Sequence, residues 1–168
     1  LDEMSVSDPF VFPDKNTRTY YLTGTGGRLY KSKDLKMWTG PYKIIDLTGT
    51  WMDGLWVAAA EIHKFGDKYY LAGTWSDDTT LIEAVPRRYN VPLNQTQLLV
   101  ADSPEGPYTP LVKEDEFCLG HRDWDIIDCT LYEENGTVRA IVIGRRAVDL
   151  PLAPQHQRIA LDVVQAAR

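Results

Sequence analysis

The chain has 168 residues, of which 43% are hydrophobic, 25% charged and 11% aromatic. This composition is typical of a folded globular protein and excludes extensive disorder. Eighteen basic against 24 acidic residues give a net charge of −6, which disfavours a phosphate-binding surface, so we expect no nucleic acid partner. No apolar run approaches the length of a membrane span, and we expect no membrane association.

The first predicted elements come from a short segment that occurs twice. Tyr20–Thr25 reads YYLTGT and Tyr69–Thr74 reads YYLAGT. Both runs are rich in aromatic residues and end at a glycine, which is typical of a strand followed by a turn. Each copy has an expected strand before it and another after it, at residues 9–12 and 29–32 in the first case and at residues 61–65 and 97–101 in the second.

A third copy begins at Asp128–Tyr132 and continues with an expected strand at Val138–Ile143. All-β units that repeat about every fifty residues are typical of propeller blades. We therefore predict an all-β propeller with about two complete four-stranded blades and the start of a third. Blade 1 is expected at about residues 5–46, blade 2 at about 55–113 and the start of blade 3 at about 124–144. The alternative is a β-sandwich with a coincidental match.

The last segment, residues 145–168, differs from the rest of the chain. It contains no glycine, and no aromatic residue follows Tyr132. Apolar residues at helical spacing between His156 and Ala167 predict a weak amphipathic helix. We expect a helical or irregular tail that does not continue blade 3, and a propeller portion that covers residues 1–144.

Two carboxylates occupy the same place in the repeat. Alignment of the three first strands puts Asp8, Ala59 and Asp128 at equivalent positions. Because the first strand of each blade lines the central channel, we expect Asp8 and Asp128 to face one pocket. Hydrolysis of a glycosidic bond needs one carboxylate to activate water and one carboxylic acid to protonate the leaving oxygen. A lone aspartate at a strand mouth often only caps a turn, but two at one repeat position favour a site.

Three segments in order resemble the motifs of glycoside hydrolase family 43, at Ser7–Val11, Ala60–Tyr70 and Ile127–Tyr132. This family consists of five-bladed β-propeller arabinofuranosidases, β-xylosidases and arabinanases, and the resemblance covers its N-terminal part. The chain departs from the family pattern at Ala60, where a proline is usual, and at Cys129, where glycine or proline is common.

The resemblance implies an inverting glycosidase that hydrolyses O-glycosidic bonds in arabinose- or xylose-containing plant polysaccharides. Asp8 would be the general base, and Asp128 would orient the general acid and modulate its pKa. The general acid of the family is a glutamate of blade four, which has no counterpart in this chain. The resemblance also implies an oligosaccharide or polysaccharide partner, no required cofactor, an optional structural calcium ion, and a secreted or periplasmic location.

Sugar rings commonly stack on aromatic faces, so we predict Trp56, Trp75 and Trp124 as substrate-binding residues. The alternative for each is packing between blades. We add Glu61 near the channel and expect its side chain to pair with a backbone or basic group, while His63 is expected to be a buried histidine with its hydrogen bonds satisfied. The two cysteines, Cys118 among them, are too few for a disulfide framework or a metal site.

Two other functions stay open at this point. The first is a catalytically inactive, truncated propeller that self-associates through its open blade edges as a homo-oligomer, because unpaired strands and bare blade faces favour association. The second is a non-catalytic carbohydrate-binding module that keeps the channel and its aromatic residues.

Overall fold

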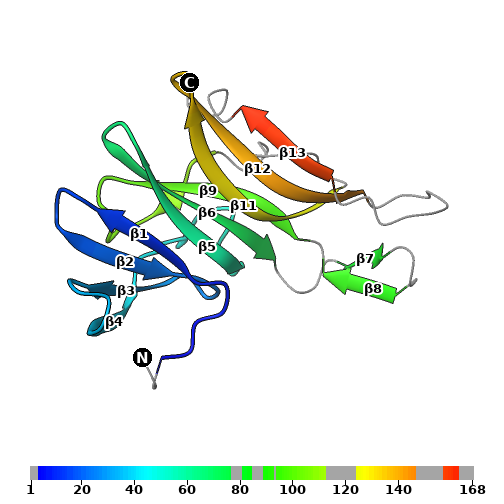
Figure 1. Cartoon of the computed structure of the whole chain (residues 1–168). Helices are drawn as coiled ribbons and strands as arrows, with labels where there is room; N and C mark the ends of the chain where they lie inside the picture. The colour runs from blue at the N-terminus through cyan, green and yellow to red at the C-terminus, as the bar shows by residue number, and fades with distance from the viewer. Residues whose placement is uncertain are drawn as a thin grey trace.

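The computed structural model describes residues 4–76, 81–84, 89–92, 94–112, 124–146 and 157–162. Within these ranges the chain forms thirteen β-strands and no α-helix. The strands form three larger antiparallel sheets and one separate hairpin, and Figure 1 shows the larger sheets arranged one after another in chain order. The fold is thus that of a partial β-propeller, and the all-β prediction is confirmed. No helix long and apolar enough to cross a membrane occurs among the described residues.

The first sheet corresponds to the predicted blade 1 and has the order β1-β2-β3-β4. Its strands are β1 (Phe10–Asp14), β2 (Thr19–Thr23), β3 (Arg28–Ser32) and β4 (Trp38–Lys43). The turn between β1 and β2 is held by the buried Asp14, whose carboxylate accepts hydrogen bonds from Asn16 N and Thr17 Oγ1, both at 3.0 Å. Asp14 is therefore a structural aspartate that satisfies backbone and hydroxyl donors of its turn.

The second sheet corresponds to blade 2 and has the order β10-β9-β6-β5. Its strands are β5 (Trp56–Phe65), β6 (Lys68–Ser76), β9 (Gln95–Ala101) and β10 (Thr109–Pro110). A hairpin that the sequence did not predict, β7 (Leu81–Ala84) and β8 (Tyr89–Pro92), is inserted between β6 and β9. In Figure 1 this hairpin extends away from the three larger sheets.

The third sheet has the order β11-β12-β13. Its strands are β11 (Trp124–Glu134), β12 (Thr137–Arg146) and β13 (Gln157–Asp162). The helix predicted between His156 and Ala167 is therefore wrong for Gln157–Asp162, and the expectation that this segment does not continue blade 3 is wrong as well. The physical reason is that β12 has an edge of unpaired N–H and C=O groups, which six residues of β13 pair with in antiparallel register. Residues 147–156 and 163–168 lie outside the described ranges.

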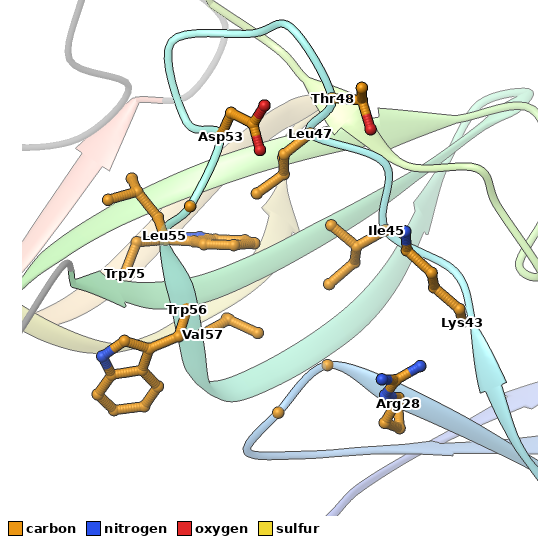
Figure 2. Close-up of a pocket in the computed structure, with 13 residues that line it drawn as sticks. Arg28, Lys43, Ile45, Leu47, Thr48, Asp53, Leu55, Trp56, Val57 and Trp75 are labelled. Atoms are coloured by element: carbon orange, nitrogen blue, oxygen red, sulfur yellow. The ribbon is translucent and has the colours of Figure 1, made fainter.

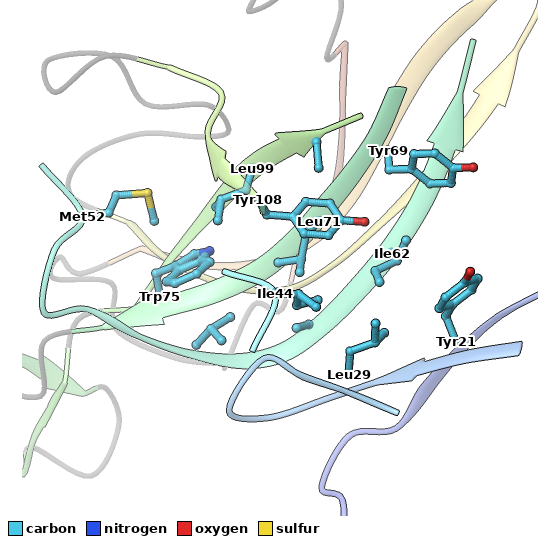
Figure 3. Packing of buried hydrophobic residues seen from close by; sticks show 13 residues of the cluster. Tyr21, Leu29, Ile44, Met52, Ile62, Tyr69, Leu71, Trp75, Leu99 and Tyr108 are labelled. Carbon is cyan, nitrogen blue, oxygen red and sulfur yellow. The ribbon is translucent and has the colours of Figure 1, made fainter. Parts of the chain in front are cut away.

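One apolar core lies between the first and second sheets and another between the second and third, so the second sheet contributes to both. In β6, Leu71 packs into the core shared with the first sheet, whereas its neighbour Ala72 packs into the core shared with the third sheet. Leu99 and Leu98 of β9 divide between the two cores in the same way. Because successive side chains of a strand point to opposite faces, a sheet that is covered on both faces needs a continuous apolar run. Figure 3 shows the core between the first and second sheets.

The first strands of the three larger sheets, β1, β5 and β11, lie next to one another in Figure 1, with β5 in contact with both of the others. This is the arrangement that the propeller prediction requires of the channel-lining strands. Cys129 of β11 is buried in the core between the second and third sheets, as expected of an ordinary core cysteine, and Cys118 lies outside the described residues.

Candidate active site at the inner strands

The three positions that the sequence repeat aligns share an unusual backbone conformation. The backbone angle φ is 51° at Asp8, 48° at Ala59 and 54° at Asp128. Residues other than glycine rarely adopt this left-handed region, and aspartate and asparagine tolerate it best. The backbone thus reproduces the equivalence of the three positions that the sequence alignment proposed.

In the second and third sheets the aligned residue, Ala59 or Asp128, lies in a β-bulge. Between β5 and β6 the register shifts from the pair Ala58–Thr74 to the pair Glu61–Ala72, which leaves one extra residue on β5. The same shift occurs between β11 and β12, at Ile127 and Thr130. Bulges of this kind redirect a side chain and are frequent beside active sites.

The first sheet has the same geometry at the entry to β1. Phe10 pairs with Thr23, while Thr25 N donates a hydrogen bond to Ser7 O at 2.9 Å. The three steps from Ser7 to Phe10 therefore face the two steps from Thr25 back to Thr23, the last residue of β2, and Asp8 lies within the longer stretch. The aligned residue of each first strand, β1, β5 or β11, thus lies where that strand has one residue more than its partner.

The carboxylate of Asp8 is exposed and is held by a hydroxyl from the turn between β2 and β3. Thr25 Oγ1 donates to Asp8 Oδ2 at 2.7 Å. The same oxygen of Thr25 accepts a hydrogen bond from Ala59 N at 3.2 Å. The structure therefore connects Asp8 of blade 1 to the bulge of blade 2 through one side chain. Sequence reasoning missed Thr25 as a site residue, although its position at the end of the repeated hexapeptide marked it.

Asp128 is also exposed, and its backbone N donates to Thr74 Oγ1 at 3.0 Å. Thr74 is the counterpart of Thr25 in the second copy of the hexapeptide. Each of the two aspartates is therefore connected to the second sheet near its bulge, Asp8 through Thr25 and Asp128 through Thr74. Unlike the buried Asp14, both aspartates are exposed.

Glu61 pairs with a basic group, as expected. Its Oε2 lies 3.0 Å from His63 Nε2, and both side chains are largely buried. The His63 ring stacks on Phe65 at 6.2 Å between centroids with an interplanar angle of 7°, and it contacts Phe10 of β1 at 5.1 Å. The pair therefore rigidifies the inner face where the first two sheets meet.

The structure brings two of the three predicted tryptophans to one cavity of about 320 Å³ between the first two sheets (Figure 2). Trp56 is 40% exposed at its edge, whereas Trp75 is 3% exposed and donates from Nε1 to Gln97 O at 3.3 Å. Trp75 thus forms a fixed wall, whereas the exposed ring of Trp56 points away from Ile45 and Leu47 on the opposite wall (Figure 2). Trp124 begins β11, and its side chain lies outside the described residues.

The cavity adjoins the Asp8 site through the β2–β3 turn. Gly26 and Gly27, which follow Thr25 directly, line it together with Val57, and Gly26 N donates to Val57 O at 2.8 Å. Arg28 and Lys43, paired across β3 and β4, form one rim. The cavity therefore combines an apolar wall with polar groups at its rim.

Among the described residues, no group of three or more histidine, cysteine, aspartate or glutamate side chains is arranged to hold a metal ion. The structural calcium ion implied by the family resemblance therefore stays a prediction without a donor set in this part of the chain.

The sequence matches the model of the family Glycosyl hydrolases family 43 over residues 3–162. Among solved structures, the chain is similar to an endo-arabinase from Bacteroides thetaiotaomicron, with 27% identity, a TM-score of 0.61, and coverage of 86% of this chain and 51% of that chain. An α-L-arabinanase from Cellvibrio cellulosa shares 21% identity with a TM-score of 0.56, over 84% of this chain and 45% of that one.

An exo-β-1,3-galactanase from Phanerochaete chrysosporium shares the fold at 13% identity and a TM-score of 0.57, over 84% of this chain and 33% of that one. The chain thus spans about half, or less, of the length of these structures. No curated protein sequence matches it.

Proposed function

Because the chain belongs to glycosyl hydrolases family 43, we propose that it carries the general-base side of an inverting glycosidase site. The substrates we propose are O-glycosidic bonds in arabinose- or xylose-containing polysaccharides. Arabinan is the first to test, since an endo-arabinase shares 27% identity with the chain over 86% of its length.

The observation that carries this proposal is the equivalence of Asp8 and Asp128. Both are exposed and both adopt the left-handed backbone conformation. Asp8 precedes β1, and Asp128 lies in the bulge of β11, the first strand of its sheet. The turn-capping Asp14 and Asp34 accept backbone hydrogen bonds within their own turns. The carboxylate of Asp8 instead accepts from Thr25, 17 positions along the chain, which supports a role other than turn capping.

In the proposed reaction Asp8 removes a proton from the attacking water as the water oxygen bonds to the anomeric carbon. The bond from that carbon to the leaving oxygen breaks, and the leaving oxygen is protonated by the general acid of the family, a glutamate of blade four. Asp128 acts on that acid as a nearby carboxylate, which favours its protonated form.

The cavity beside Asp8 is the proposed place for a neighbouring sugar unit of the chain. Trp75 shapes the wall of the cavity, and Trp56 offers its exposed ring for stacking at the outer edge, beside the cavity. We retain Trp124 and Glu61 in the proposed binding surface, with Glu61 acting through its bond to His63.

The test is hydrolysis of arabinan and of aryl arabinosides and xylosides by the full-length protein and by Asp8→Asn. We expect Asp8→Asn to lower the rate about 10²–10⁴-fold without unfolding, because asparagine tolerates the left-handed conformation of residue 8. The matched control is Asp67→Asn, in the exposed turn between β5 and β6, for which we expect the wild-type rate. Wild-type turnover by Asp8→Asn would refute the proposal.

A further inference from the structure

Thr25 lies between two groups of the site, and neither the sequence nor the family motifs assign it a role. Its Oγ1 is 2.7 Å from Asp8 Oδ2 and 3.2 Å from Ala59 N. One hydroxyl therefore contacts the carboxylate of blade 1 and the backbone of blade 2.

The direction of both hydrogen bonds follows from the chemistry of the partners. A peptide N–H only donates, so Thr25 Oγ1 is the acceptor toward Ala59. The single hydroxyl proton is then free for Asp8, whose ionised carboxylate only accepts. Hydrogen bonds to a charged acceptor are stronger than those between neutral groups, so the hydroxyl holds Oδ2 in a fixed direction.

Nothing else among the described residues donates a hydrogen bond to the Asp8 carboxylate. The residue is exposed and precedes β1, so packing does not fix its side-chain torsions. Without the Thr25 hydroxyl the carboxylate would rotate among several rotamers. A general base must instead be held in one orientation toward its proton donor.

The repeat separates this role from ordinary packing between blades. Thr74, the counterpart of Thr25, accepts a hydrogen bond from Asp128 N in the same way. The residue of its own sheet that corresponds to Asp8 is Ala59, which has no carboxylate. The link between blades is therefore common to both threonines, whereas the bond to a carboxylate distinguishes Thr25.

We propose that Thr25 is the positioning residue of the general base Asp8. Its hydroxyl fixes Oδ2 and leaves Oδ1 to take the proton from the attacking water, while its bond to Ala59 sets the orientation of the carboxylate relative to blade 2. This inference rests on the proposed function of Asp8.

The test compares Thr25→Val, Thr25→Ser and Thr23→Val in the full-length protein. Thr23 is the matched control: its buried hydroxyl donates to Ala60 O at 2.7 Å, which joins the same two sheets without contact to a carboxylate. We expect Thr25→Val to lower kcat about 10–100-fold with little change in KM, since misplacing a reacting group has effects of this size. Thr25→Ser should restore most of kcat, and Thr23→Val should lose stability but keep kcat within about twofold.

Three results would overturn the proposal: a wild-type kcat in Thr25→Val, no rescue by serine, or an equal loss of kcat in Thr23→Val. A wild-type protein that hydrolyses no substrate would refute the proposed function, and a second measurement then decides the role of Thr25 by itself. NMR three-bond couplings should show one Asp8 rotamer in the wild type and in Thr23→Val, and rotamer averaging in Thr25→Val. A single, unchanged rotamer in Thr25→Val would contradict the positioning role.

Discussion

Ala59 adopts, with a φ of 48°, the same left-handed backbone conformation that Asp8 adopts at 51°. The two residues occupy equivalent bulges in neighbouring blades, yet only Asp8 carries a functional group. A β-carbon in this region costs roughly 1–2 kcal/mol. The repeat therefore keeps a strained backbone at a position where blade 2 has no carboxylate to present.

This strain predicts that Ala59→Gly stabilises the protein. Glycine removes the clash of the β-carbon but loses more chain entropy on folding, so we expect a net gain of up to about 1 kcal/mol in the free energy of unfolding. The adjacent Ala60, fully buried and without a positive φ, is the control, and Ala60→Gly should lose about 0.5–1 kcal/mol. Urea unfolding measures both, and a destabilised Ala59→Gly would show that the conformation carries no strain.

A second prediction concerns the tripeptide Gly-Pro-Tyr, which occurs at the outer edges of blades 1 and 2. Tyr108 is fully buried, donates to Pro104 O at 3.4 Å and pairs with the backbone of Ile44; burial raises the pKa of its phenol. We expect Tyr108→Ala to cost about 3–5 kcal/mol, the range for deleting a buried aromatic ring.

The counterpart Tyr42 is 41% exposed and lies under the Lys31 ammonium at 4.6 Å. Tyr42→Ala should therefore cost only about 0.5–1 kcal/mol, the value of an exposed cation–π contact. Thermal unfolding of the two variants tests the contrast, and equal losses would contradict the assignment of Tyr108 to the core between the blades.

A third prediction concerns pH. Backbone N–H groups of Met37 and Lys36 hold the pKa of Asp34 below its ordinary value of 3.8. A carboxyl whose pKa is lower in the folded state stabilises the fold above its ordinary pKa, and this contribution disappears as the pH falls through the folded value. Asp34→Asn should therefore be less stable than the wild type at pH 7, and the difference should shrink below about pH 4.

Denaturant unfolding at a series of pH values from neutral to acidic measures this difference directly. The control variant is Asp67→Asn. Asp67 is exposed in the turn between β5 and β6, and no such pair of backbone donors holds its carboxylate among the described contacts. If the difference in the free energy of unfolding between the wild type and Asp34→Asn is the same at every pH, the prediction is contradicted.

The sequence was sufficient for features that depend on local pattern. The repeated hexapeptide at Tyr20–Thr25 and Tyr69–Thr74 predicted β2 and β6 at the same place in two blades, and the alignment of Asp8 with Asp128 predicted two equivalent carboxylates. These predictions rely on alternating side chains and turn residues, which a strand imposes on its own sequence.

Features that depend on contacts between distant segments were beyond the sequence. The repeated hexapeptide marks Thr25, but its bond to Asp8, 17 positions away, depends on how the chain folds back at the entry to β1. Apolar spacing between His156 and Ala167 favoured a helix, but pairing with β12 decided the outcome for Gln157–Asp162. Likewise, Tyr42 and Tyr108 follow the same Gly-Pro pair, and only the packing of blade 2 against the loop after β4 buries one of them.

The most direct test of the account is chemical rescue of Asp8→Gly in the full-length protein. Glycine suits the left-handed backbone of residue 8, so this variant deletes the carboxylate without new strain. With an aryl α-L-arabinofuranoside and sodium azide, we predict that the lost activity returns and that NMR identifies the β-arabinofuranosyl azide, because azide replaces the water that Asp8 activates. No rescue, or an azide product of retained α configuration, would contradict Asp8 as the base of an inverting glycosidase.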